Sequence, residues 1–136
     1  MKRNHAEFAA IELDATYLGL YGKGGVTTLP VGPEFWETID SNPAARGTLV
    51  TQGVSEADWP HWEMHPKGDE VVYLLEGDVT MIFDRAPKEI RVRLGPGQAV
   101  VVPAGVWHRA LVPVSSRLLF MTYGEGTAHK PLAKAK

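Results

Sequence analysis

The sequence predicts one all-β domain with a short helical segment near its N-terminus. Short apolar and β-branched segments alternate with turn residues about every eight to twelve positions, which is typical of a β-sandwich or barrel. The 136 residues include 14 glycines and 10 prolines, enough to supply many tight turns. A chain of this length, 44% hydrophobic, fits a single domain with one core.

Residues 15–42 are expected to contribute two strands and the helical segment. Two apolar runs, at residues 17–21 and 26–29, lie on either side of a glycine-rich turn and are predicted as strands. Residues 32–39 have a proline at a helix-start position and acidic side chains directly after it. This pattern predicts one or two turns of helix, which end before Asn42 and the proline that follows it.

The core of the domain is expected over residues 45–124, as a succession of strands and turns. Residues 71–75 are apolar at every position, which indicates a strand covered on both faces. Residues 84–89 separate two strands and indicate an exposed hairpin turn. Residues 125–136 are predicted to be a mobile tail. The strands are predicted at residues 48–52, 59–65, 71–75, 80–83, 90–94, 100–102 and 118–122.

Composition excludes several classes of partner. The net charge of −2 gives no indication of nucleic acid or an anionic membrane surface as a partner. The chain has no cysteine, so disulfides and thiolate ligands are excluded. No apolar stretch approaches the ~20 residues of a membrane span, and no apolar segment follows the basic N-terminus as in a secretory signal. A cytoplasmic protein is therefore expected.

A histidine- and carboxylate-rich stretch precedes the apolar run of the predicted central strand. Residues two apart in an extended chain point to the same side, so His61, Glu63 and His65 share one face. Residues 66–69 contain a proline and a glycine and indicate a turn. After this turn Glu70 can return to the same face. Imidazole and carboxylate groups in this arrangement are suitable ligands for a divalent metal ion.

A second stretch, residues 97–108, consists of a strand, a turn and a single histidine. A valine-rich strand at residues 100–102 ends at a turn containing Pro103 and Gly105, and His108 follows three residues after that glycine. From such a turn the His108 side chain can face the interior of the domain. The second stretch therefore supplies one further imidazole.

Together the two stretches resemble the paired motifs of the cupin superfamily, G-x5-H-x-H-x3-4-E-x6-G and G-x5-P-x-G-x2-H-x3-N. The resemblance departs at three positions, where Ala57, Glu63 and Val112 stand in place of the opening glycine, the first histidine and the closing asparagine. The remaining positions match in spacing: His65, Glu70 and Gly77 in the first motif, and Gly97, Pro103, Gly105 and His108 in the second.

The resemblance implies a small single-domain cupin of the type 2 kind, folded as a jelly-roll β-barrel. It also implies that Glu63, His65, Glu70 and His108 bind a divalent ion, with manganese, iron, nickel and zinc as the metals that suit two imidazoles and two carboxylates. A buried Glu70 without a partner would be unfavourable, so it needs a cation, a hydrogen-bond network or a raised pKa. An alternative role for Glu63 is that of a general base. His61 competes with Glu63 for the position of the fourth metal ligand.

The leading functional prediction is a metal-binding cupin that acts on a small polar metabolite, as an oxygenase, an isomerase or a lyase. The alternatives are a non-catalytic module that binds a small molecule or sugar, and a metal-free isomerase or epimerase. No catalytic residue is assigned. The strand at residues 71–75 is apolar on both faces, and a two-fold contact that covers its outer face predicts a homodimer. His5 and His129 lie near the chain ends and are expected to face solvent without a role in the site.

Overall fold

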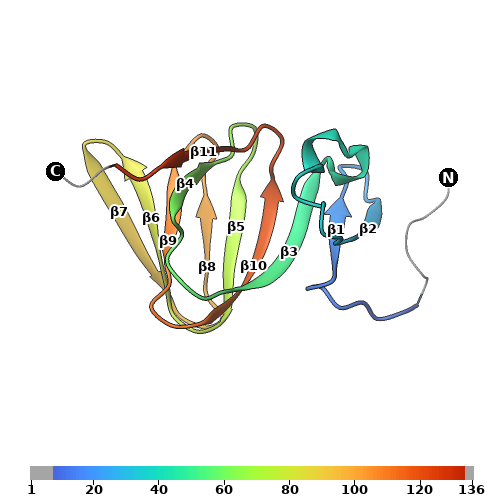
Figure 1. Cartoon of the computed structure of the whole chain (residues 1–136), viewed down its shortest axis with the longest axis horizontal. Coiled ribbons are helices and arrows are strands. Elements are labelled where there is room, and N and C mark those ends of the chain that lie inside the picture. Colours follow the sequence, from blue (N-terminus) through green and yellow to red (C-terminus); the bar gives the residue numbers. More distant parts are fainter. Residues whose placement is uncertain (1–7, 134–136) are drawn as a thin grey trace.

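The computed structural model describes residues 8–133 and folds them into two antiparallel β-sheets (Figure 1). The hairpin of the first two strands lies at one end of the molecule and β7 lies at the other. The strands are β1 (Thr16–Leu20), β2 (Val26–Pro30), β3 (Thr48–Ser55), β4 (His61–Met64), β5 (Glu70–Glu76), β6 (Val79–Arg85), β7 (Lys88–Leu94), β8 (Ala99–Val102), β9 (His108–Leu111), β10 (Ser116–Tyr123) and β11 (Ala128–Pro131).

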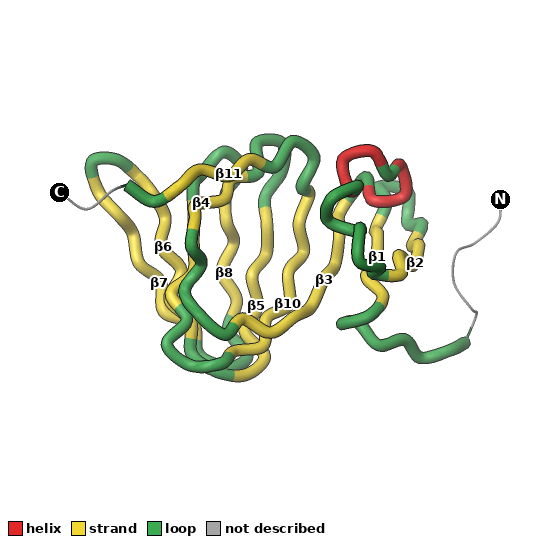
Figure 2. Tube along the Cα trace, viewed as in Figure 1, coloured by secondary structure: helices red, strands yellow, loops and turns green. Residues whose placement is uncertain are grey.

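The all-β prediction is confirmed, but the predicted closed barrel is wrong. One sheet has the strand order β2-β1-β3-β10-β5-β8 and the other has the order β11-β4-β9-β6-β7, so across residues 8–133 no strand ladder joins the two (Figure 2). The chain crosses between the sheets several times, and at the crossings after β4 and after β8 it passes through Pro66 and Pro103, which have no N–H to donate to a ladder. The result is an open double-sheet sandwich.

The main hydrophobic core fills the space between the two sheets. Along β5 the side chains alternate, so that Glu70, Val72 and Leu74 are buried on the inner face. Leu118 of β10 and Met81 of β6 pack in the same cluster. Because Glu70 is the first inward residue of β5, a carboxylate lies at the end of this apolar layer.

A second, smaller core lies beneath the N-terminal hairpin, and here the predicted helix is wrong. Residues 33–37 form turns, followed by two 3₁₀ helices, η1 (Ile39–Ser41) and η2 (Pro43–Ala45). The segment between the prolines at 33 and 43 is too short to offset the unfavourable nucleation of an α-helix. Phe35 instead packs edge-on against Tyr17, with ring centroids 5.3 Å apart. Within residues 8–133, neither 3₁₀ helix nor any other is long and apolar enough to cross a membrane.

The predicted strands all form, and two further strands were not predicted. β9 begins at His108, in a stretch that the sequence indicated only as a turn. β11 lies within the predicted mobile tail and pairs with β4 over residues 128–131. Residues 134–136 lie outside the described part of the chain. β11 positions a histidine beside the site described below.

Candidate metal centre

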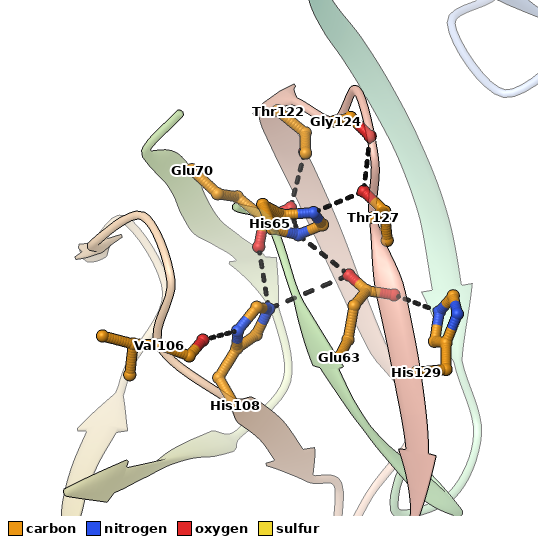
Figure 3. A network of polar contacts seen from close by, with 9 residues as sticks. All are labelled: Glu63, His65, Glu70, Val106, His108, Thr122, Gly124, Thr127 and His129. Carbon is orange, nitrogen blue, oxygen red and sulfur yellow. Dashed lines mark hydrogen bonds and ion pairs between the residues drawn. The ribbon is translucent and has the colours of Figure 1, made fainter. Parts of the chain in front are cut away.

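Four side chains converge between the sheets, near the corners where the chain crosses from one sheet to the other (Figure 3). Glu63 comes from β4 and His65 from the turn that follows it. Glu70 is the first residue of β5, and His108 is the first residue of β9. Each residue offers one ligand atom, and these four atoms all lie within 4.8 Å of one another. The structure therefore brings together the four residues that the sequence singled out.

Strand register and two linked turns explain this convergence. Glu63 pairs directly with His108 across β4 and β9, so their side chains project from the same face. The backbone N–H of Gly105 donates to the His65 carbonyl at 2.9 Å, which joins the turn of the second stretch to the turn of the first. Asp69 strengthens this link by accepting a 2.9 Å hydrogen bond from the Ala104 N–H.

The contacts within the cluster are close but poorly directed for hydrogen bonding. His65 Nε2 lies 3.1 Å from Glu63 Oε1 and 3.3 Å from Glu70 Oε2. His108 Nε2 lies 3.3 Å from Glu70 Oε1 and 3.8 Å from Glu63 Oε1. Yet in the described part of the chain, both Nε2 atoms and Glu70 Oε1 are buried without a hydrogen-bond partner. Such groups are unfavourable unless a cation or another partner reaches them.

The Nδ1 atoms of His65 and His108 point away from the cluster, and their hydrogen-bond partners define the tautomer of each ring. His108 Nδ1 lies 3.0 Å from the Val106 carbonyl, which can only accept, so this nitrogen carries the proton. His65 Nδ1 lies 2.7 Å from Thr127 Oγ1, whose hydroxyl donates to the Gly124 carbonyl at 2.6 Å. The Thr127 oxygen therefore accepts from His65. In each neutral ring, Nε2 then presents a lone pair toward the carboxylates, which is the arrangement a metal ligand requires.

The charges of the cluster are strongly coupled. Burial alone would raise the pKa of Glu70, but the close contacts of its carboxylate with His108 and His65 outweigh burial and lower the pKa. The same balance of burial against the two imidazoles holds the pKa of Glu63 well below its usual range. Burial disfavours the imidazolium forms, but the two carboxylates raise the pKa of both His65 and His108 to about 9. The two carboxylates can therefore be balanced by two protons or by one divalent cation.

A cavity of about 650 Å³ extends from the cluster toward the N-terminal hairpin. Its volume lies within the range of small-molecule sites. Glu63, His65 and Glu70 line it, whereas His108 is fully buried behind them. The remaining wall combines polar side chains, among them Asp40, Gln52 and Glu125, with apolar and aromatic ones: Tyr17, Trp36, Ile39, Ala45, Leu49, Trp59 and Phe120.

The structure distinguishes between the two residues of β4 that compete as ligands, and it brings an unexpected histidine next to the site. His61 is exposed and lies outside the cluster, with its ring packed edge-on against the ring of His129. His129 is exposed, as expected, but its Nε2 also lies 3.0 Å from Glu63 Oε2, a contact that the sequence did not predict. The residues around His129 carry no apolar alternation that would have predicted β11. His5 lies outside the described residues.

A family model described as "Cupin domain" matches residues 48–122. This chain belongs to the cupin family. The match runs from the start of β3 to the last residue but one of β10 and includes all four residues of the cluster. No curated protein sequence matches the chain.

Several solved structures are similar to part of this chain. Peruvianin-I, a cysteine peptidase from Thevetia peruviana latex, is 18% identical with a TM-score of 0.55 over 67% of this chain and 61% of that one. A cupin-2 domain protein from Shewanella frigidimarina is 21% identical with a TM-score of 0.49 over 55% of this chain and 69% of that one. Hydroquinone 1,2-dioxygenase from Sphingomonas sp. TTNP3, with 4-hydroxybenzoate bound, is 15% identical with a TM-score of 0.46 over 54% and 57%. This chain spans less than two thirds of the first and third of these proteins.

Proposed function

We propose that this cupin binds one divalent metal ion through Glu63, His65, Glu70 and His108 and acts on a small molecule held in the adjacent cavity. The observation that carries the proposal is the set of three buried, unpartnered atoms among the described residues, His65 Nε2, His108 Nε2 and Glu70 Oε1. Protons on the imidazoles would balance the charge, but they would not align with the carboxylates. A cation near the centre of the four ligand atoms satisfies all of them together.

Two imidazoles and two carboxylates form a donor set suited to manganese, iron, nickel or zinc. When bound, such an ion would supply Lewis-acid polarisation of a ligand oxygen or, in the case of iron, oxygen chemistry. The chain's own residues orient the donors: Val106 and Thr127 hold the imidazoles, and Thr122 donates to Glu70 Oε2 at 2.5 Å. These outer contacts present the donor atoms in a fixed arrangement before the ion arrives.

The cavity wall supports a more specific class of small molecule. Beyond the cluster, the aromatic and aliphatic wall favours a ligand with an apolar body, in addition to a polar group that faces the site. Arg46 lines the same cavity and, within residues 8–133, has no carboxylate at ion-pair distance. A ligand with an apolar body and a second, anionic group would use both features. We therefore extend the predicted small polar metabolite to an amphipathic acid.

Metal analysis of untagged protein tests the proposal. Protein incubated with manganese, iron, nickel or zinc and then desalted is expected to retain about one ion per chain of at least one metal. The matched control carries His65→Ala and His108→Ala together and is expected to retain none. A wild-type chain that stays free of all four metals would refute the proposal.

A second candidate, a metal-free module that binds a small molecule, is favoured by one observation. With the pKa of His65 and His108 at about 9, two imidazolium groups balance two carboxylates at neutral pH without any metal. This candidate predicts that the amphipathic acid binds equally well with and without a chelator. The metal-centred proposal predicts that EDTA weakens that binding.

We also propose that the chain forms a homodimer through the outer face of β5. Val71 and Tyr73 on this face are half-buried, and Val101 of the neighbouring β8 is 57% exposed. A two-fold contact would cover these apolar side chains. Light scattering at micromolar concentration is expected to give the mass of a dimer, and Val101→Lys is expected to shift it toward a monomer. A wild-type monomer would contradict this proposal.

A further inference from the structure

We infer that His129 is a positioning residue of the metal centre, which holds Glu63 so that a single carboxylate oxygen faces the other ligands. The inference rests on the proposed metal binding. β11 pairs with β4 in a register that puts His129 directly opposite Glu63. Side chains of directly paired residues project from the same face of a sheet, so their contact follows from the backbone arrangement.

The two oxygens of Glu63 have separate partners, as Figure 3 shows. Oε1 faces the cluster, 3.1 Å from His65 Nε2 and 3.8 Å from His108 Nε2. Oε2 faces away from it and lies 3.0 Å from His129 Nε2. A carboxylate with one oxygen engaged outside the cluster is restricted to binding an ion through the other.

Glu63 needs such a restraint more than the other donors do. Glu70 is 3% exposed and bonded to Thr122, whereas Glu63 is 24% exposed. A glutamate also has three side-chain torsions, while the histidine that the cupin motif places at this position has two. Without an outer partner, the Glu63 carboxylate would be free to rotate, to bind through both oxygens or to turn toward solvent.

His129 is itself held in place from a second side. Its ring packs edge-on against the ring of His61, with centroids 4.8 Å apart and an angle of 83° between the planes. It is half-exposed and lines the cavity beside Glu63. His61, although no ligand, thus contributes to the support of the Glu63 side of the site. Outer-shell partners of this kind typically change metal affinity 10- to 100-fold when they are replaced.

Cobalt(II) titration of three variants tests the inference, with visible absorption as a readout of coordination number. His129→Phe keeps an aromatic ring against His61 but removes the donor, so the Kd for Co²⁺ is expected to rise at least about ten-fold. The intensity of the absorption band is expected to change, because Glu63 is then free to bind through both oxygens. His129→Gln retains an N–H donor and is expected to restore both values. His61→Phe, the matched control, is expected to leave them close to wild type.

Two results would overturn the inference while leaving the metal centre intact. One is a His129→Phe protein with the wild-type Kd and spectrum, and the other is a His129→Gln protein indistinguishable from His129→Phe. His129→Ala takes the place of the phenylalanine variant in this comparison if that variant does not fold. Wild-type protein that binds no Co²⁺, Mn²⁺, Fe²⁺, Ni²⁺ or Zn²⁺ would instead refute the proposed function, and this inference with it.

Discussion

The two halves of the metal centre differ in burial and in the origin of their support. His65, Glu70 and His108 are 4%, 3% and 0% exposed, and each has a fixed partner in a neighbouring strand or turn. On the other side, Glu63 is 24% exposed and its partner His129 is 50% exposed. The buried half has unpartnered atoms that it cannot satisfy by rearranging, and this supports the proposed cation. The exposed half can rearrange, so under that proposal it sets the coordination number of the bound cation.

The largest expected effect comes from the fully buried ligand. His108→Ala removes an imidazole that water cannot replace in the same position, so metal affinity is expected to fall by more than about 100-fold, beyond the 10- to 100-fold typical of outer-shell changes. Calorimetric titration with Mn²⁺ or Zn²⁺ measures this loss. His61→Phe, which keeps an aromatic ring against His129, is the control and is expected to bind metal as wild type does. Equal losses in the two variants would show that the buried half has no special role.

A smaller loss is expected from the exposed ligand. Glu63→Ala leaves a position that solvent can reach, so water can replace the lost oxygen and affinity is expected to fall about 10- to 100-fold. The same titration gives the value beside that of His108→Ala. If Glu63→Ala lost as much affinity as His108→Ala, or none at all, the division into two halves would be wrong.

The partner of Glu70 provides a finer test of the buried half. Thr122→Val keeps the shape of the side chain but removes the 2.5 Å hydrogen bond to Glu70 Oε2. Metal affinity is expected to fall about ten-fold, at the lower end of the outer-shell range. The control, Thr28→Val, alters a buried threonine of the N-terminal hairpin and is expected to leave affinity unchanged. Unchanged affinity in Thr122→Val would mean that the Glu70 carboxylate needs no outer partner.

The dependence of stability on pH is expected to reverse when metal is added. In metal-free protein the pKa of His65 and His108 rises from 6.5 to about 9 on folding, so their stabilising contribution is complete below pH 6.5 and is lost as the pH rises through about 9. The melting temperature in EDTA should therefore fall by a few degrees over this interval. In excess Mn²⁺ the melting temperature should instead rise as the pH increases, because fewer protons compete with the ion for the imidazoles. Parallel slopes in the two titrations would contradict the coupling of metal and imidazole.

The sequence predicts the four candidate ligands but not the support around Glu63. His65, Glu70 and His108 follow from motif spacing, because each is fixed by a turn adjacent to a strong apolar strand. The support from His129 does not, because β11 is a four-residue strand with a mixed pattern, and its pairing with β4 depends on tertiary contacts. The expected N-terminal helix fails for a related reason. Its local signals are overridden by Phe35, which packs into the core with Tyr17.

The central claim is that one divalent ion replaces the protons on two buried imidazoles, and proton release on metal binding tests it most directly. Calorimetric titration near pH 7.5, repeated in two buffers with different enthalpies of ionisation, gives both the stoichiometry and the number of protons released. With the pKa of His65 and His108 at about 9, we expect one ion per chain and close to two protons released for each ion bound. Binding without proton release, or an unchanged proton count in His108→Ala, would contradict the account.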